Sequence, residues 1–438
     1  MSRSVKTILS VIISACVLSA APCLAQGTSM DIYEAIDLTL KNNSSLRSLR
    51  QEVIKAEAFK IQADGTLLPN LSASAYINRQ KENLATLAAT EQNEAKYAAA
   101  TLEQTLYSGG KNSAIRRQAP QVKTMADLLI TEGENSTLGE LFARFYNVLL
   151  QRERIKAEQS AVSTSEVHFR QVKKMNELGL ANRLEVIRAA QQLATNTADL
   201  STAKGLHEAA HISLMNYMAI PPESKRPISG NLTSPETASG DRAASLAVAT
   251  ANRADLHRLK EQYKYQGNQV EIEKSGLRPK LIFTALGGYT YPYMRKDEGD
   301  QTWKVELSAA VPIFDRNVTR SNVMKAEATR RQDKIALEQK ELDIKSEVET
   351  AWTDIETTLR RLKASEKALE LAKESLRLAE VGFREGVTPQ LDLLDAQTSY
   401  TSARLDYLSA EYNHLLTIVA LKVTEGTILD WAKGKNFK

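Results

Sequence analysis

Two histidines and a glutamate occur at the spacing of a zinc-binding helix. His207, Glu208 and His211 fit the H-E-x-x-H pattern, which places two imidazoles on one helix turn with a glutamate as base. A catalytic zinc needs a third protein ligand, and the only histidines downstream are His257 and His414. The pattern also lies near the end of a heptad helix, where histidine and glutamate are ordinary solvated residues. A secreted zinc metalloprotease is therefore one alternative for this chain.

A second group that suggests chemistry is the aspartate pair Asp392 and Asp395. Their spacing of three residues places both carboxylates on one face of a helix. Acidic residues near a helix N-terminus also complement the helix dipole, an explanation that suits Asp392 better than Asp395. The segment Gly109-Gly110-Lys111 lacks the upstream glycine and the following serine or threonine of a phosphate-binding loop. No cofactor is expected, and the sequence favours a protein that is not an enzyme.

The N-terminus has the pattern of a secretory signal peptide. A positive start is followed by an apolar run over residues 8–18 and by small residues that end at Ala25. Cleavage after Ala25 would remove both cysteines, so the mature chain would need no disulfide in an oxidising compartment. A second interpretation is a lipoprotein signal in which Cys16 carries the lipid.

The rest of the chain excludes two further classes. No apolar run of about 20 residues follows the signal, so no transmembrane helix is expected. The net charge of +4 falls to +2 without Arg3 and Lys6, and basic and acidic residues are interleaved. This balance is no signature of a nucleic-acid-binding protein.

The sequence contains an internal duplication. Leu106-Tyr107-Ser108 corresponds to Ile313-Phe314-Asp315, and the segment from Gly179 to Val186 corresponds to that from Gly386 to Leu393. Both pairs are 207 residues apart, so the helix between them has the same length in each copy. Such repetition defines the architecture. The expected parts are a signal peptide at 1–25, a first repeat at 26–218, a linker at 219–242, a second repeat at 243–423 and a tail at 424–438.

Each repeat contains two segments in which apolar and polar residues alternate. Polar loops are expected between them, at 79–95 and at 292–301. Short alternating segments with one small, apolar face are the signature of outer-membrane β-barrels. The apolar faces comprise Leu71, Ala73, Ala75 and Ile77; Ala98, Ala100, Leu102, Gln104 and Leu106; Leu281, Phe283, Ala285 and Tyr289; and Trp303, Val305, Leu307, Ala309 and Val311.

Four strands cannot close a barrel, and an open sheet edge in lipid leaves backbone groups without hydrogen bonds. If these strands span a membrane, the barrel must therefore be assembled from several chains. The prolines and glycines expected at the turns between strands and helices are Pro69, Gly109, Gly110, Pro279 and Pro312.

Helices account for most of the remaining sequence. One helix is expected at about 30–64, and two very long ones at 111–178 and 318–385, each about 100 Å long at 1.5 Å per residue. Sustained heptad spacing predicts coiled-coil packing. Gly179 and Gly386 are expected to end the long helices. Caps for the helices that follow are expected from Asn182 with Glu185, and from Thr388 with Pro389. Each repeat thus contains a helical hairpin.

With these features in this order, the chain resembles the outer-membrane efflux protein family, the TolC-like channels. The resemblance covers nearly all of the expected mature sequence. It rests on Tyr33-Glu34-Ala35-Ile36 with Asn42-Asn43, on Leu68-Pro69-Asn70-Leu71, on the run from Gln104 to Gly110, on the run from Val311 to Asp315, and on the run from Leu391 to Gln397.

The resemblance implies a mostly α-helical fold with a small β part. Duplicated hairpins would form a periplasmic α-barrel, and four strands per chain would contribute to a 12-stranded transmembrane β-barrel of a homotrimer. The implied function is a passive exit duct of a tripartite efflux or type I secretion system. Its partners would be outer-membrane lipid, a periplasmic adaptor protein and an inner-membrane transporter, with no nucleic acid.

The resemblance also assigns roles to residues at the hairpin ends. Asp392 and Asp395 would form the periplasmic aperture, a ring of six carboxylates in a trimer that favours cations, with Glu185 beside them. Phe383 stands where the family has a tyrosine and Thr388 where it has an arginine, so the polar links of the closed state do not carry over. The expected docking sites for the adaptor are Gly179, Leu180, Asn182, Gly386, Val387 and Thr388.

A periplasmic coiled-coil scaffold without a pore is the remaining alternative. The four alternating segments argue against it, because a scaffold has no use for an apolar band of strands. Family members serve drug efflux, metal export and protein secretion, and the resemblance does not distinguish among these substrates.

Overall fold

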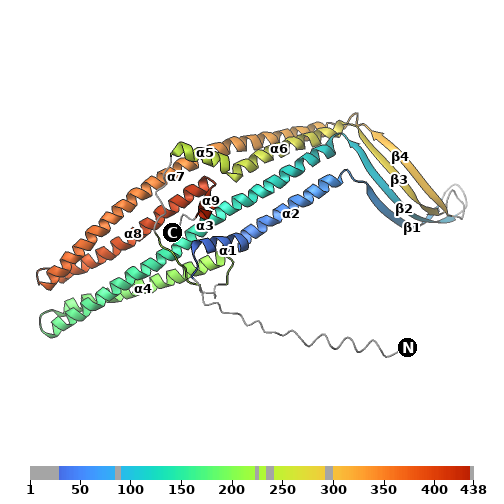
Figure 1. Ribbon diagram of the computed structural model, residues 1–438. Coiled ribbons are helices and arrows are strands. Elements are labelled where there is room, and N and C mark those ends of the chain that lie inside the picture. Colours follow the sequence, from blue (N-terminus) through green and yellow to red (C-terminus); the bar gives the residue numbers. More distant parts are fainter. Residues whose placement is uncertain (1–28, 84–89, 222–225, 233–240, 292–298, 435–438) are drawn as a thin grey trace, which may run out of the picture.

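The computed structural model describes residues 29–83, 90–221, 226–232, 241–291 and 299–434. The expected signal peptide, including Cys16, therefore lies outside the described residues. The molecule is elongated, with a β-sheet at one end and the turns of two helical hairpins at the other (Figure 1). The sequence-based prediction of a mostly α-helical chain with a small β part is confirmed.

The first helical segment is broken in two, which differs from the single helix expected at 30–64. Helix α1 spans Ile32–Asn42 and α2 spans Ser44–Gly65. Between them, Asn43 leaves the helical conformation, and its side-chain oxygen accepts the N–H of Ser45 at 3.0 Å. Its side-chain nitrogen donates to the main-chain oxygen of Tyr217 at 3.0 Å. An asparagine that caps the next helix competes with continuation of the first.

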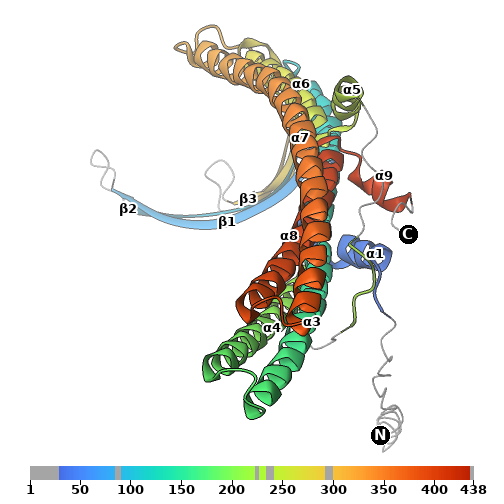
Figure 2. The same ribbon diagram turned by 90° about the vertical axis from the view of Figure 1, so that its left-hand side faces the viewer.

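Four strands form one antiparallel sheet in chain order: β1 Asn70–Asn83, β2 Thr90–Ser108, β3 Lys280–Tyr291 and β4 Asp300–Ala310. The register pairs Leu71 with Leu102, Leu102 with Ala285, and Ala285 with Val305. Directly paired residues point to the same side of a sheet, so the predicted apolar face continues across all four strands. The sheet is strongly curved (Figure 2).

Two details of the sheet differ from expectation. The first hairpin is longer than predicted: pairing continues from Asn78 with Ala95 to Asn83 with Thr90, where a loop was expected. Ladder hydrogen bonds join backbone groups, so a polar sequence can extend a hairpin once its register is set. In β2 the register shifts between Thr105 and Tyr107, so Leu106 is the extra residue of a β-bulge. The alternation expected to include Leu106 is therefore interrupted there.

The long helices agree closely with the prediction. Helix α3 spans Lys111–Glu177 and α7 spans Val318–Arg384, 67 residues each. Their hairpin partners, α4 at Arg183–Tyr217 and α8 at Gln390–Thr424, are 35 residues each. Helix α2 packs against α3. In the described part of the chain, no helix combines the length and apolarity of a membrane span.

Shorter helices complete the second repeat. Helix α5 spans Arg242–Asn252, α6 spans Ala254–Lys274, and the 3-10 turn η2 spans Ser275–Leu277. Helix α6 packs against both α3 and α7 (Figures 1 and 2).

Each strand pair is connected to its long helix by a turn with two left-handed residues. In the first repeat these are Gly109 and Gly110, with φ of 67° and 90°. At the positions 207 residues later, Arg316 and Asn317 have φ of 57° and 63°. Asparagine adopts this conformation readily, but a side chain such as that of Arg316 costs roughly 1–2 kcal/mol there, so Arg316 carries strain that glycine avoids in the first turn.

The prolines expected at these junctions lie at strand boundaries. Pro69 immediately precedes β1, Pro279 immediately precedes β3, and Pro312 follows the end of β4. Proline has no N–H for a ladder hydrogen bond, which suits it to positions where pairing begins or has ended.

The main hydrophobic core lies midway along the helices. It joins α1, α3, α4 and α8 with α9, a short helix at Ile428–Lys433. In α9, Ile428 is fully buried, and Trp431 packs on Phe142 with ring centroids 5.4 Å apart. The tail that contains α9 has no recognisable sequence motif, because six residues are too few for a visible helical period. A second core joins α5, α6, α7 and α8, around Leu256, Ile344 and Trp352.

Candidate functional site

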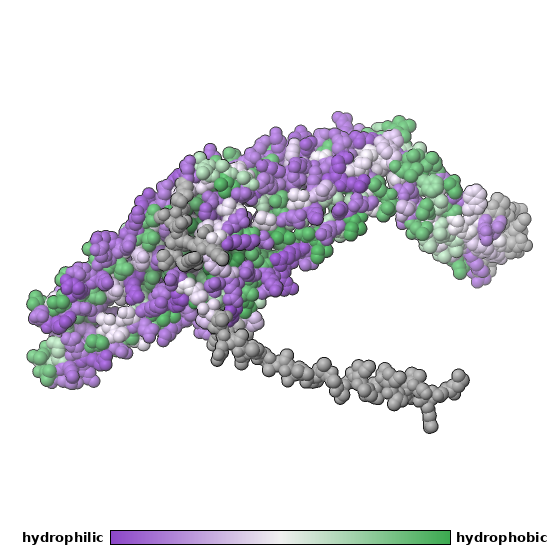
Figure 3. Space-filling view, in the orientation of Figure 1, coloured by the Kyte–Doolittle hydropathy of each residue, from purple (hydrophilic) through white to green (hydrophobic). Residues whose placement is uncertain are grey.

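The two hairpins end in turns of the same form. Gly179 and Gly386 both have φ of 73°, as expected for glycines that end helices. In each turn, the residue after the glycine donates its N–H to the carbonyl oxygen five positions back, at 2.8 Å. Apolar side chains are exposed beside both glycines, with Leu180 at 71% and Val387 at 81% exposure. Figure 3 shows apolar residues gathered at these ends and over the strands.

The helices that follow begin differently. At α4, Asn182 and Glu185 form the predicted capping box: each side chain accepts the other's N–H, at 2.9 Å. At α8, the cap position is occupied by Pro389, which has no side-chain hydrogen bond to offer. The prediction that Thr388 caps α8 is wrong, because the N–H of Thr388 instead donates to the oxygen of Gly382 and helps to close α7.

Asp392 and Asp395 lie near the start of α8, and both are exposed. Leu393 and Leu394 between them are buried, with 3% and 8% exposure. Within the described residues, neither carboxylate has an ion-pair or hydrogen-bond partner. The exposed face that carries them continues along α8 to Asp406.

Gln390 connects the second hairpin to the first, a contact that the sequence analysis missed. Its side-chain Nε2 donates to the main-chain oxygen of Glu185 at 2.9 Å and to Nε2 of His168 at 3.3 Å. Gln390 and His168 are 6% and 5% exposed, and the His168 ring packs edge-on against Phe383 with centroids 5.3 Å apart. The available signal was a histidine on the buried seam of a heptad helix, where a polar residue specifies a particular partner.

Part of the interior between the main core and the hairpin ends is polar. The buried side chains of Glu158 and Ser165 on α3 line a cavity of about 190 Å³ with Asn196 and Asp199 of α4. Burial, and secondarily the charge of Asp199, raises the pKa of Glu158. Thr398 and Thr401 of α8 line the same cavity, so a polar stretch lies between the two hairpins, with the apolar main core on one side of it and the buried Leu393 and Leu394 on the other.

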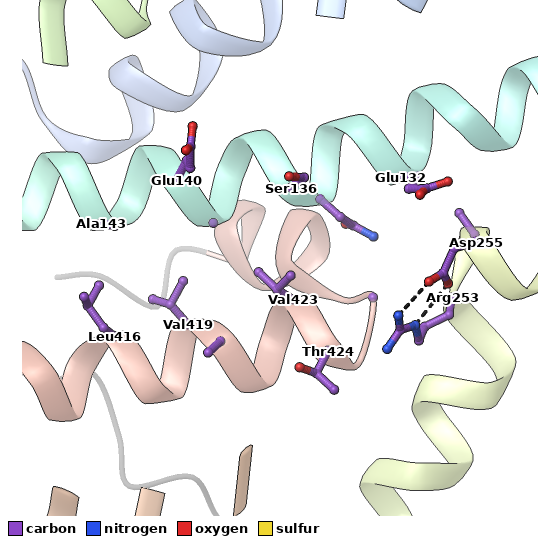
Figure 4. Close-up of a pocket in the computed structure, with 15 residues that line it drawn as sticks. Glu132, Ser136, Glu140, Ala143, Arg253, Asp255, Leu416, Val419, Val423 and Thr424 are labelled. Atoms are coloured by element: carbon purple, nitrogen blue, oxygen red, sulfur yellow. Dashed lines mark hydrogen bonds and ion pairs between the residues drawn. The ribbon is translucent and has the colours of Figure 1, made fainter. Parts of the chain in front are cut away.

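A larger cavity, of about 610 Å³, lies between α3, α8 and the start of α6 (Figure 4). At its edge Arg253 holds Asp255 through two hydrogen bonds, of 3.0 and 2.6 Å, and also contacts Glu347. Lys340 reaches Asp255 at 2.8 Å. Burial alone would raise the pKa of Asp255, but the hydrogen bonds from Arg253 and Lys340 outweigh it and hold that pKa well below its ordinary value.

A sequence model of the outer membrane efflux protein family matches residues 35–219 and 246–427, which is most of the chain. The chain belongs to the outer membrane efflux protein family. The two matched segments each contain one strand pair and one long helical hairpin. No individually curated protein matches the chain.

Solved structures of outer-membrane channels have the same fold as this efflux family member. The OprN channel is 21% identical over 90% of this chain and 89% of its own, with a TM-score of 0.77. The CmeC channel of Campylobacter jejuni is 16% identical, covering 92% and 89%, with a TM-score of 0.79. The open state of the MtrE channel of Neisseria gonorrhoeae is 21% identical, covering 91% and 89%, with a TM-score of 0.74.

The H-E-x-x-H segment of this efflux protein lies on α4, beside a cavity of about 710 Å³. His211 donates through Nε2 to the main-chain oxygen of Arg226 at 2.8 Å. Burial, then the neighbouring His211 and Arg152, lowers the pKa of His207. In the part of the chain that the structure describes, no three metal-ligating side chains lie together. The family is one of channels rather than enzymes, which argues against the metalloprotease alternative.

Proposed function

We propose that this chain is one of three identical protomers of an outer-membrane exit duct. It passively conducts substrate that an inner-membrane transporter delivers through a periplasmic adaptor. The observation that carries this proposal is the open sheet, whose β1 and β4 edges have no partner strand within the described residues. Unpaired backbone groups in lipid cost several kcal/mol each. Pairing β4 of one protomer with β1 of the next removes these edges, and three copies give a closed barrel.

Exposed apolar residues along the helices support the same assembly. Ile54 and Ile61 on α2 are seven residues apart, as are Ile335 and Leu342 on α7, and all four are more than half exposed. Heptad-spaced apolar residues normally pack against a partner helix. Neighbouring protomers supply such a partner when the hairpins are arranged as a tube in the periplasm.

We propose that the narrow end of this tube lies at the hairpin turns. Asp392 and Asp395 of three protomers would form a ring of six carboxylates there, with Glu185 close by on the adjacent hairpin of each chain. The support for this role is the position of both aspartates on an exposed face one turn inside the hairpin end. A carboxylate ring favours cations over anions.

Membrane fractionation followed by light scattering of the detergent-extracted protein tests the assembly. The expected result is a particle of about three chain masses from the outer membrane, which forms channels in a planar bilayer. A soluble monomer would contradict the proposal and favour the pore-less scaffold. Stoichiometric bound zinc, with activity lost in Glu208→Gln, would favour the metalloprotease.

The hairpin ends are also the proposed docking site for the adaptor, through Gly179, Leu180 and Asn182 of one turn and Gly386, Val387 and Thr388 of the other. Leu180→Asp with Val387→Asp is expected to reduce co-purification of adaptor and transporter at least about tenfold, since burial of one such side chain contributes roughly 1.5–3 kcal/mol.

The control for this experiment is Gly205→Asp, which adds one such charge on the exposed surface of α4, where a new Cβ meets no atom within 4 Å. Both proteins should retain the trimer mass. Undiminished co-purification with the double variant would show that the adaptor docks elsewhere.

A further inference from the structure

The contact of Gln390 with His168 and Glu185 lies beside the proposed aperture. Gln390 is two residues before Asp392, in the first turn of α8. Its two hydrogen bonds reach both helices of the other hairpin, through His168 on α3 and the main chain of Glu185 on α4. The His168 ring also packs edge-on against Phe383 of α7, with centroids 5.3 Å apart.

We propose that Gln390 and His168 form a proton-sensitive latch, which holds the two hairpins of one protomer together at the aperture and is released when His168 is protonated. This inference rests on the proposed function, because a latch here regulates passage only if the hairpin ends close a duct. It assigns His168 and Gln390 as positioning residues for Asp392 and Asp395.

The hydrogen-bond chemistry fixes the protonation state of the latch. A glutamine nitrogen is only a donor, so Nε2 of His168 must be an acceptor and the ring must be neutral. Protonation places an N–H of His168 against an N–H of Gln390. If the side-chain amide of Gln390 then rotates by half a turn, its oxygen faces the main-chain oxygen of Glu185. The hydrogen bond from Gln390 to α4 is then lost. Either response removes a bond between the hairpins.

The affinity of the His168 ring for a proton differs between the latched and the released state because of its surroundings. Burial lowers the pKa of His168 in the latched state. Glu380 and Arg384 of α7 line the same cavity, of about 340 Å³, which gives solvent a route to the ring. From α4, the carboxylate of Glu185 is held by the N–H of Asn182.

Because of this difference, protons bind preferentially to the released state, in which the ring regains its ordinary pKa near 6.5. Acid below about pH 6 therefore favours release. The side-chain oxygen of Gln390 is buried without a hydrogen-bond partner in the described chain. An unpaired buried oxygen costs free energy in the latched state, so the latch is weakly held.

Bilayer recordings of the full trimer at about pH 7.5 and about pH 5 test the latch. Loss of one hydrogen bond between the hairpins, with a buried polar group left unpaired, is expected to raise the open probability of the wild type roughly tenfold in acid. Gln390→Ala should be open to the same degree at both pH values. His168→Gln offers Gln390 an uncharged acceptor and should stay closed at both. His257→Gln, on α6 far from the hairpin ends, should retain the acid response.

The outcomes separate the latch from the duct. Channels that keep the full acid response in His168→Gln would overturn the latch and leave the duct intact. A wild type that forms no channels at any pH would overturn the proposed function itself. If Gln390→Ala fails to assemble, the comparison of His168→Gln with wild type still decides.

Discussion

Trimers that carry both Asp392→Ala and Asp395→Ala are expected to lose block by divalent cations and to conduct more current. A divalent ion about 5 Å from one carboxylate gains about 1.7 kcal/mol even in a water-like dielectric. Removal of several such contacts should weaken block on the order of a hundredfold. Cation selectivity should fall in the same variant. The measurement is single-channel conductance in a planar bilayer, with and without the divalent ion.

Asp406→Ala is the matched control for this experiment. Asp406 lies on the same exposed face of α8, 11 residues from Asp395, a separation of about 16 Å along the helix. This is well beyond the Debye length of about 8 Å at physiological salt, so block at the aperture should be nearly unchanged. Equal weakening by both variants would indicate a general surface-charge effect rather than a ring.

Arg253→Met is expected to destabilise the fold substantially. The side chains of Arg253 and Asp255 are only 12% and 16% exposed. Without the arginine, Asp255 keeps just one of the two basic side chains that bond it, that of Lys340. Loss of one partner of a buried ion pair typically costs about 3–5 kcal/mol, and the partial exposure here suggests about 2–3 kcal/mol. The measurement is the midpoint of heat-induced loss of the trimer.

The same network gives a pH dependence. The pKa of Asp255 is lower in the folded chain than its ordinary value of 3.8. The carboxylate therefore stabilises the fold fully above about pH 4, and this stabilisation is lost as the pH falls below that value. The acid-induced loss should be smaller in Arg253→Met, because the variant lacks the hydrogen bonds that lower this pKa.

Arg242→Met serves as the control for the Arg253 variant. Arg242 bonds Glu349 and Glu356, but its side chain is 40% exposed. Exposed ion pairs are screened by solvent, so its loss should scarcely move the midpoint. A midpoint for Arg253→Met as high as that of Arg242→Met would show that the network is not a major source of stability.

The features predicted from the sequence are those that repeat over many residues. The heptads and the terminal glycines Gly179 and Gly386 gave the ends of α3 and α7 within one residue. The period-two alternation gave the apolar face of the sheet. Both signals work because burial of one face of a helix or strand recurs at a fixed spacing.

What the sequence did not predict depends on single residues and on long-range contacts. The break at Asn43 and the left-handed pair Arg316 and Asn317 are local choices with no periodic signature. Leu106 keeps the alternation of its neighbours, so its bulge appears only in the register with β3. Gln390 and His168 are 222 residues apart, and only the packing of one hairpin on the other brings them together.

The polar stretch between the two hairpins has a mechanical consequence. The well-packed core ends near His414 on α8, about 36 Å along the helix from Gln390. Helices α7 and α8 pack against each other beyond the core, so this part of the hairpin can act as one lever arm that pivots at the core. A rotation of only about 10° there would displace its far end by about 6 Å over such a length. A small rotation at the core therefore moves the hairpin end by about the width of a hydrated ion.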